Sequence, residues 1–89
     1  MPFLRSGFLS VEPMLQAVDL GPWLDELEWV IAGSESGHGA RPCNLDWVRN
    51  MRDQCVAAGV AFFWKQHVER AKKTETPELD GKQWVEYPR

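Results

Sequence analysis

Residues 44–64 read NLDWVRNMRDQCVAAGVAFFW and place a helix signal directly before a strand signal. Apolar side chains recur at helical steps within residues 45–58, and Asn44 before them is a residue type that caps helix N-termini. Gly59 stands where glycine commonly ends a helix, and the apolar, aromatic run 60–64 follows at once. The stretch therefore predicts a helix over residues 45–58 that leads straight into a strand.

Two further strand signals lie earlier in the chain. An apolar run fills residues 7–11, and Pro13 closes it because proline has no amide proton to give to a strand ladder. Residues 28–33 (EWVIAG) have the composition of a strand that is buried on both faces, as in a parallel sheet. A short helix over residues 22–27, with Pro22 in its first turn, is predicted between them. This order of elements favours a parallel sheet.

We therefore predict an α/β fold with a small, three-stranded, mainly parallel sheet and two helices over residues 1–68. Residues 69–78 are polar and charged without an apolar period, which predicts a mobile connection. A turn signal over residues 79–82 and a short apolar segment follow, and that segment could add a strand or pack Trp84 on the core. Residues 69–89 are thus expected to form a polar linker and a C-terminal hairpin or tail that packs on or extends the core.

The composition narrows the class of protein. The 89 residues are 44% hydrophobic and 26% charged, which indicates one globular domain. No apolar stretch approaches the roughly 20 residues of a membrane span, and the N-terminus lacks a signal-peptide pattern, so we expect a cytoplasmic protein. The net charge of -3 has the wrong sign for broad phosphate-backbone binding, so direct nucleic-acid binding is not favoured. Cys43 and Cys55 form no C-x-x-C pair and are interpreted as buried thiols.

Three polar sets are predicted at the carboxyl ends of the strands, where ligand-binding groups gather in parallel α/β sheets. The candidate binding residues are Glu12, Glu35, His38, Arg41, Lys65 and Gln66. Carboxylates beside a lysine and an arginine could do acid–base work or hold a cationic group, and they could equally form a satisfied ion-pair cluster. The histidine spacing does not support a metal site. We assign no catalytic residue, no metal ligand and no cofactor.

The five tryptophans admit two interpretations. Tryptophan rings can stack on nucleic-acid bases, but such platforms work beside a basic groove, which an acidic chain does not predict. Trp29 and Trp64 lie in predicted strands, and Trp23 and Trp47 lie in predicted helices, where burial is the default. Core and interface packing is the prediction for these rings.

A set of motifs resembles a phage and prophage family of unknown function that looks like a branch of the radical S-adenosylmethionine enzymes. The motifs are FLSVEPML (8–15), VDLGPWL (18–24), LEWVIAGSESGHGARP (27–42), WVR (47–49), RDQC (52–55), AAGV (57–60), FF (62–63), KQ (65–66) and LDG (79–81). They extend over nearly the whole chain. The resemblance implies that the chain is similar to the last strand–helix units of a partial (β/α) barrel.

The chain also departs from that family. Members usually carry an N-terminal half with clustered cysteines of the kind that bind a [4Fe–4S] cluster, whereas this chain starts just before the first matching strand and holds two scattered cysteines. Ser34 stands where the family usually has a glycine, and His67-Val68 replaces a Trp-Gly pair. A cluster-dependent radical reaction is therefore not expected of this chain alone.

Three functional hypotheses follow. The leading one is a non-enzymatic phage or mobile-element protein that binds, and inhibits, a host protein or ribonucleoprotein defence complex such as a CRISPR effector in the host cytoplasm, as an anti-CRISPR-type inhibitor. It rests on the sheet edges and core wall that a shortened barrel exposes, which a partner or a homodimer would have to cover. The second is the carboxyl-terminal half of a split radical S-adenosylmethionine-like enzyme. The third, a nucleic-acid-binding module, requires seven basic side chains to share one face: Arg41, Arg49, Arg52, Lys65, Arg70, Lys72 and Lys73.

Overall fold

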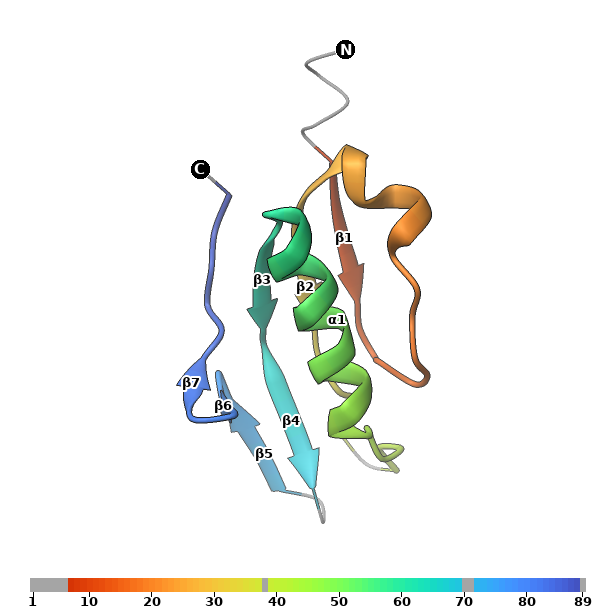
Figure 1. Cartoon of the computed structure of the whole chain (residues 1–89). Coiled ribbons are helices and arrows are strands. Elements are labelled where there is room, and N and C mark those ends of the chain that lie inside the picture. The colour runs from red at the N-terminus through yellow and green to blue at the C-terminus, as the bar shows by residue number, and fades with distance from the viewer. Residues whose placement is uncertain (1–6, 38, 70–71, 89) are drawn as a thin grey trace.

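The computed structural model describes residues 7–37, 39–69 and 72–88. Its parallel half consists of one sheet, one α-helix and one short 3-10 helix (Figure 1). In chain order these elements are β1 (Gly7–Val11), η2 (Gly21–Glu26), β2 (Leu27–Ala32), α1 (Leu45–Ala58) and β3 (Ala61–Trp64). Four short strands follow: β4 (Gln66–Glu69), β5 (Lys72–Glu75), β6 (Glu78–Leu79) and β7 (Lys82–Gln83).

The central sheet has the strand order β1-β2-β3, and both pairings are parallel. Helix α1 connects β2 to β3 and lies across one face of the sheet (Figure 1). The predicted three-stranded parallel sheet is therefore confirmed. None of the helices in the described part of the chain has the length and apolar character that crossing a bilayer demands.

The bounds of α1 agree with the sequence signals. The side chain of Asn44 accepts a hydrogen bond from the Asp46 amide at 2.8 Å, which satisfies one of the free donors of the first turn. At the other end Gly59 has φ +72°, the left-handed conformation that glycine adopts without steric cost. The predicted helix over residues 45–58 and both of its caps are confirmed.

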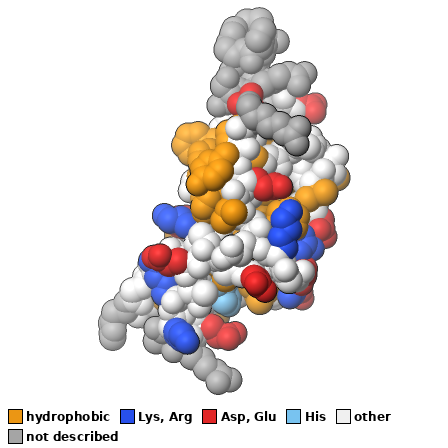
Figure 2. Space-filling model, turned by 90° about the vertical axis from the view of Figure 1, so that its left-hand side faces the viewer, with side chains coloured by type: hydrophobic (Ala, Val, Ile, Leu, Met, Phe, Trp, Pro, Cys, Tyr) orange, Lys and Arg blue, Asp and Glu red, His pale blue; other side chains and the backbone are white. Residues whose placement is uncertain are grey.

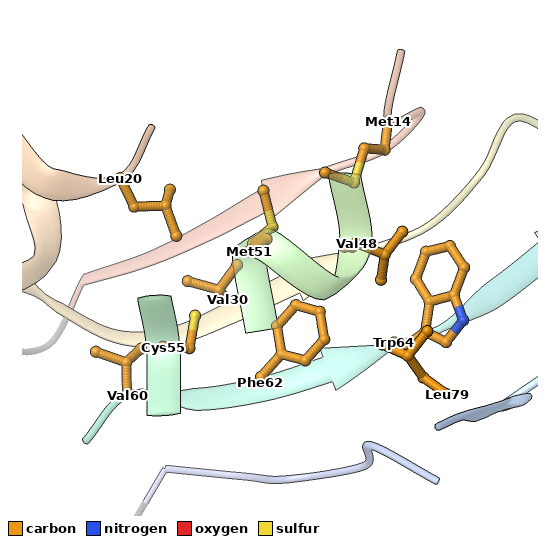
Figure 3. Packing of buried hydrophobic residues seen from close by; sticks show 11 residues of the cluster. Met14, Leu20, Val30, Val48, Met51, Cys55, Val60, Phe62, Trp64 and Leu79 are labelled. Atoms are coloured by element: carbon orange, nitrogen blue, oxygen red, sulfur yellow. The ribbon is translucent and has the colours of Figure 1, made fainter. Parts of the chain in front are cut away.

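The core lies between α1 and the sheet face that it covers. Phe62 of β3 points toward Val30 of β2 and toward Met51 and Cys55 of α1 (Figure 3). Further core side chains come from β2, β3, α1 and β6 and from the loops between β1 and β3: Met14, Leu20, Ala32, Val48, Val60, Trp64 and Leu79. The sheet, the helix, the segment between β1 and β2 and the C-terminal strand β6 thus contribute to one cluster.

The second predicted helix has the expected length, but it is a 3-10 helix, which is wound more tightly than an α-helix. Residues 21–26 form the 3-10 helix η2, and none of its side chains is buried. Leu20 precedes it without a side-chain cap, and six residues give too few hydrogen bonds to offset α-helix nucleation. The short predicted helix is therefore present within one residue of its expected place, and α1 is the only α-helix among the described residues.

The polar segment after the sheet contains a hairpin that the sequence did not indicate. Strands β4 and β5 pair antiparallel where a mobile connection was expected over residues 69–78. All four residues of β5 are exposed, so the strand shows no apolar alternation. The hairpin is held at its base, where the amide of Thr76 donates to the Lys65 carbonyl at 2.9 Å and the Gln66 side chain donates to the Ser34 carbonyl at 2.7 Å.

The C-terminal segment closes over the end of the core. Strands β6 and β7 pair around Asp80-Gly81, which confirms the predicted turn. The Asp80 carboxylate accepts from Arg49 at 2.9 Å and from Arg52 at 2.6 Å, and these contacts attach the turn to α1. Trp84 packs edge-on against Phe62, with ring centroids 6.3 Å apart. The sequence left open whether this segment adds a strand or packs Trp84 on the core, and both features are present.

Candidate binding surface

The predicted polar cluster at the strand ends consists of separate pairs. Lys65 and Glu12 follow β3 and β1, and their Nζ and Oε2 atoms are 3.1 Å apart. The contact spans β2 at Gly33, where an added Cβ would lie 3.3 Å from the Glu12 side chain. A larger residue at this position would therefore press on the carboxylate that reaches across. The small residue after β2 allows the two outer strand ends to be bridged.

The second pair stabilises the loop between β2 and α1. Arg41 donates to both carboxylate oxygens of Glu35, through Nε at 2.8 Å and Nη2 at 2.7 Å, and its backbone amide also donates to Glu35 Oε1 at 2.9 Å. This geometry is the bidentate form of a charge-assisted hydrogen bond. The side-chain and then the backbone hydrogen bonds from Arg41 lower the pKa of Glu35 to about 2. A carboxylate this acidic is a poor proton acceptor near neutral pH.

Two predicted site residues remain, Gln66 and His38, and only Gln66 is among the described residues. Gln66 is buried, and it donates to the Ser34 carbonyl, while Ser34 Oγ accepts from the Val68 amide at 2.7 Å. Gln66 therefore joins β4 to the end of β2 and is not free to take a ligand with that amide group. His38 lies outside the described residues. The described residues bring together no group of three His, Cys, Asp or Glu side chains that could hold a metal ion.

We expect the Glu35–Arg41 pair to be observable by titration. Replacing Arg41 with glutamine should raise the pKa of Glu35 from about 2 toward 4.5, the value of an unperturbed glutamate. Because the folded-state pKa is the lower one, the stabilisation is complete above pH 4.5 and is lost as the pH falls toward 2. Carboxyl-carbon NMR titration measures this directly. Arg49→Gln is the control, since Arg49 pairs with Asp46 and Asp80. A Glu35 pKa near 4.5 in the unaltered chain would contradict the geometry.

The basic side chains are largely engaged with carboxylates. Five of the seven that the nucleic-acid hypothesis would place on one face are in ion pairs: Arg41, Arg49, Arg52, Lys65 and Lys73. Of the other two, Lys72 is exposed on β5, and Arg70 lies outside the described residues. Binding a phosphate through the paired side chains would require breaking these contacts. The geometry thus gives this hypothesis no support.

The two cysteines differ in their surroundings. Cys55 is fully buried in the core, and burial, with a smaller effect from the Glu86 charge, raises the pKa of its thiol to about 12. Cys43 is only partly buried, and desolvation raises the pKa of its thiol as well. Burial of both thiols was expected, and it holds fully only for Cys55. Both are protonated near neutral pH, which makes them poor nucleophiles.

The sheet side away from α1 is an open, aromatic face. The resemblance to a shortened barrel implied an exposed core wall, but the residues that form this face were not predicted from the sequence. Phe8, Trp29 and Phe63 alternate with the core residues of β1, β2 and β3 and so point to this side. Tyr87 from the C-terminal segment packs on both Trp29 and Phe63, at centroid distances of 5.6 Å. Phe8 and Trp29 are 6.2 Å apart. We call these four residues the aromatic face.

The aromatic face is only partly covered. Phe8 is 64% exposed and Tyr87 is 66% exposed, whereas Trp29 and Phe63 are half-buried. Hydrophobic side chains gather in one patch in the upper part of the view in Figure 2. In the described part of the chain, α1 is the only α-helix, and it lies on the opposite face. The composition of β2 predicts that both faces of the sheet are buried. The described residues fully cover only the face on which α1 lies. This continuous apolar run was the available signal for a second covered face.

A family model described as "Protein of unknown function (DUF5131)" matches residues 4–88. The chain belongs to this family. The DUF5131 match includes the three strands of the central sheet, so the aromatic face and the Glu12–Lys65 pair both lie within it. Comparison with curated proteins and with solved structures gave no match.

Proposed function

We propose that the chain is a non-enzymatic binding protein that docks its aromatic face on a protein partner. The single observation that carries this proposal is an apolar sheet of which, among the described residues, one face is fully covered and the other only partly. Parallel sheets occur almost only with both faces covered, and contiguous exposed apolar surface marks interaction sites. The occupant we propose is therefore an apolar surface of a protein, enriched in side chains that pack against aromatic rings.

The class of partner comes from the family likeness. The motifs resemble phage and prophage proteins, and small phage proteins of this type often act on host defence. We propose that the partner is a host defence complex in the host cytoplasm, such as a CRISPR effector, and that binding inhibits it. This step is an analogy and does not follow from the geometry of the surface. The engaged state of Glu35 supports a binding role over acid–base chemistry at the strand ends.

The proposal is tested with the tagged chain and a reconstituted effector. We expect the chain to co-purify with the effector in a fixed stoichiometry from a host lysate, and to suppress target cleavage when it is added to the purified effector. Recovery of an unrelated protein does not count as support. If the effector is not retained and cleaves its target at an unchanged rate, the proposed function is wrong.

A second candidate is favoured by one observation. The Glu12–Lys65 pair lies at the carboxyl ends of the strands, on the same side of the sheet as the aromatic face. In a barrel this side would be the interior, and its carboxyl end would be the substrate side. The alternative is thus one half of a split radical S-adenosylmethionine-like enzyme, with the three strands as the last units of the barrel. Co-expression with a cysteine-rich partner should then yield a complex with an iron–sulfur absorption band. The absence of such a complex would rule out this alternative.

A further inference from the structure

The two outer edges of the central sheet differ. The edge of β3 is occupied by the C-terminal segment, since the Trp64 amide donates to the Trp84 carbonyl at 2.7 Å and the Glu86 amide donates to the Phe62 carbonyl at 3.1 Å. Residues Phe63 and Val85 form an antiparallel bridge between these contacts. The edge of β1 has no such cover among the described residues, because β2 is the only strand that pairs with it there.

The backbone groups at the free edge can be identified. The Val11 carbonyl accepts from the Gly33 amide at 3.1 Å, so the backbone groups of Val11 point toward β2. In a strand, the N–H and C=O groups of one residue point to the same side, and those of the next residue point to the opposite side. The amides and carbonyls of Ser10 and Phe8 therefore point away from β2. Both residues are exposed, and no hydrogen bond joins their backbone groups to a described segment outside the sheet.

The side chains beside this edge favour the same kind of occupant. Phe8 and Ser10 direct their side chains to the side of the aromatic face, and Phe8 contacts Trp29. A strand that pairs with β1 would therefore place every second side chain on the same side of the sheet as Phe8. Apolar side chains at these positions would enlarge the aromatic face. Unpaired edge groups are a template for an extended segment, and the main-chain hydrogen bonds then supply affinity while alternate side chains supply specificity.

We propose that the free edge of β1 binds an extended segment of the partner protein, which adds to the sheet as a fourth strand through the backbone groups of Phe8 and Ser10. The inference rests on the proposed function in that it names which part of the partner is recognised. Its chemistry is an uncharged, extended peptide in which aromatic or β-branched residues alternate. Only two residues of β1 offer outward groups, which suits a short peptide better than a β1-to-β1 contact between two copies of the chain.

The test uses a displayed library of ten-residue peptides, so it does not depend on the identity of the host partner. Ser10→Pro removes the outward amide and leaves the pairing of β1 with β2 in place, whereas Ser10→Ala keeps the amide and is the matched control. We expect enriched peptides with alternating apolar residues to bind the alanine variant as they bind the unaltered chain, and to bind the proline variant at least tenfold more weakly. Both variants are checked for an unchanged unfolding transition.

Hydrogen exchange in the unaltered chain provides a measurement that needs no variant. The Ser10 amide should exchange rapidly in the free chain and become protected when a selected peptide is bound. Protection of this amide in the free chain, equal peptide binding by the proline variant, or a dimer that the proline substitution dissociates would each overturn the inference. If the effector is captured but the peptides bind both variants equally, the edge proposal fails and the proposed function stands. If the peptides behave as expected and no effector is captured, the edge proposal stands and the proposed function is wrong.

Discussion

Replacing Phe62 with alanine is expected to lower the free energy of unfolding by about 3–5 kcal/mol. The Phe62 side chain is fully buried between the sheet and α1, and its ring also contacts Trp84 of the C-terminal segment. Removing it leaves a cavity at the point where the helix, β2 and the C-terminal segment meet. Because domains of this size are stable by only about 5–10 kcal/mol, the variant should be partly unfolded at 37 °C. Urea unfolding followed by tryptophan fluorescence measures the change.

The matched control is the same substitution at an exposed phenylalanine. Phe8→Ala removes the same atoms from a side chain that is 64% exposed, and we expect it to change the free energy of unfolding by less than about 1 kcal/mol. The contrast between the two variants tests which face of the sheet is the core. Equal losses at both positions would mean that the aromatic face is as fully packed as the helix-covered face, and the docking proposal would lose its basis.

Replacing Phe8 and Tyr87 together with serine is expected to weaken binding to the defence effector at least about 30-fold, because the loss of a single hot-spot ring worth about 2 kcal/mol already gives this factor. The two rings flank Trp29 on the aromatic face and are both mostly exposed in the free chain. Binding of the purified effector by surface plasmon resonance gives the dissociation constant. A melting temperature close to that of the unaltered chain would show that the loss is one of contact and not of folding.

The control for this pair is an exposed aromatic residue elsewhere. Trp23 is 56% exposed and lies on η2, which contacts α1 and is not one of the elements that form the aromatic face. Trp23→Ser should leave the dissociation constant within about twofold of that of the unaltered chain, as is usual for residues outside an interface. An equal loss from Trp23→Ser would indicate a general need for surface apolarity, and it would contradict a localised docking face.

The parts of the fold that the sequence predicted depend on local signals. The Asn44 cap and Gly59 set the ends of α1 through contacts within a few residues, so both ends could be predicted from the sequence alone. The central strands were recognisable because their aromatic and β-branched runs are interrupted by glycine and proline. The β4–β5 hairpin was not recognisable, because it is held at its base by bonds to distant groups, such as that from Gln66 to Ser34, and not by an apolar face.

The candidate site shows the same division. Glu12 and Lys65 were correctly placed near each other, because carboxyl ends of parallel strands meet at one edge of the sheet. The exclusive pairing of Glu35 with Arg41 depends on the shape of the loop that joins them, which composition does not encode. Trp29 was expected in the core or at an interface, and which of these holds depends on what covers the second face of the sheet. That property belongs to the three-dimensional arrangement and not to the strand sequence.

The measurement that tests the docking claim most directly is site-specific photo-crosslinking in host cells. A photoreactive amino acid is placed in one chain at the position of Phe8 and in another at the position of Trp23, two exposed aromatic sites on different elements. Our account predicts an adduct with a subunit of a host defence complex from position 8 and none from position 23. An adduct of the same kind from position 23, or no adduct from position 8, would contradict the claim that the aromatic face is the binding surface.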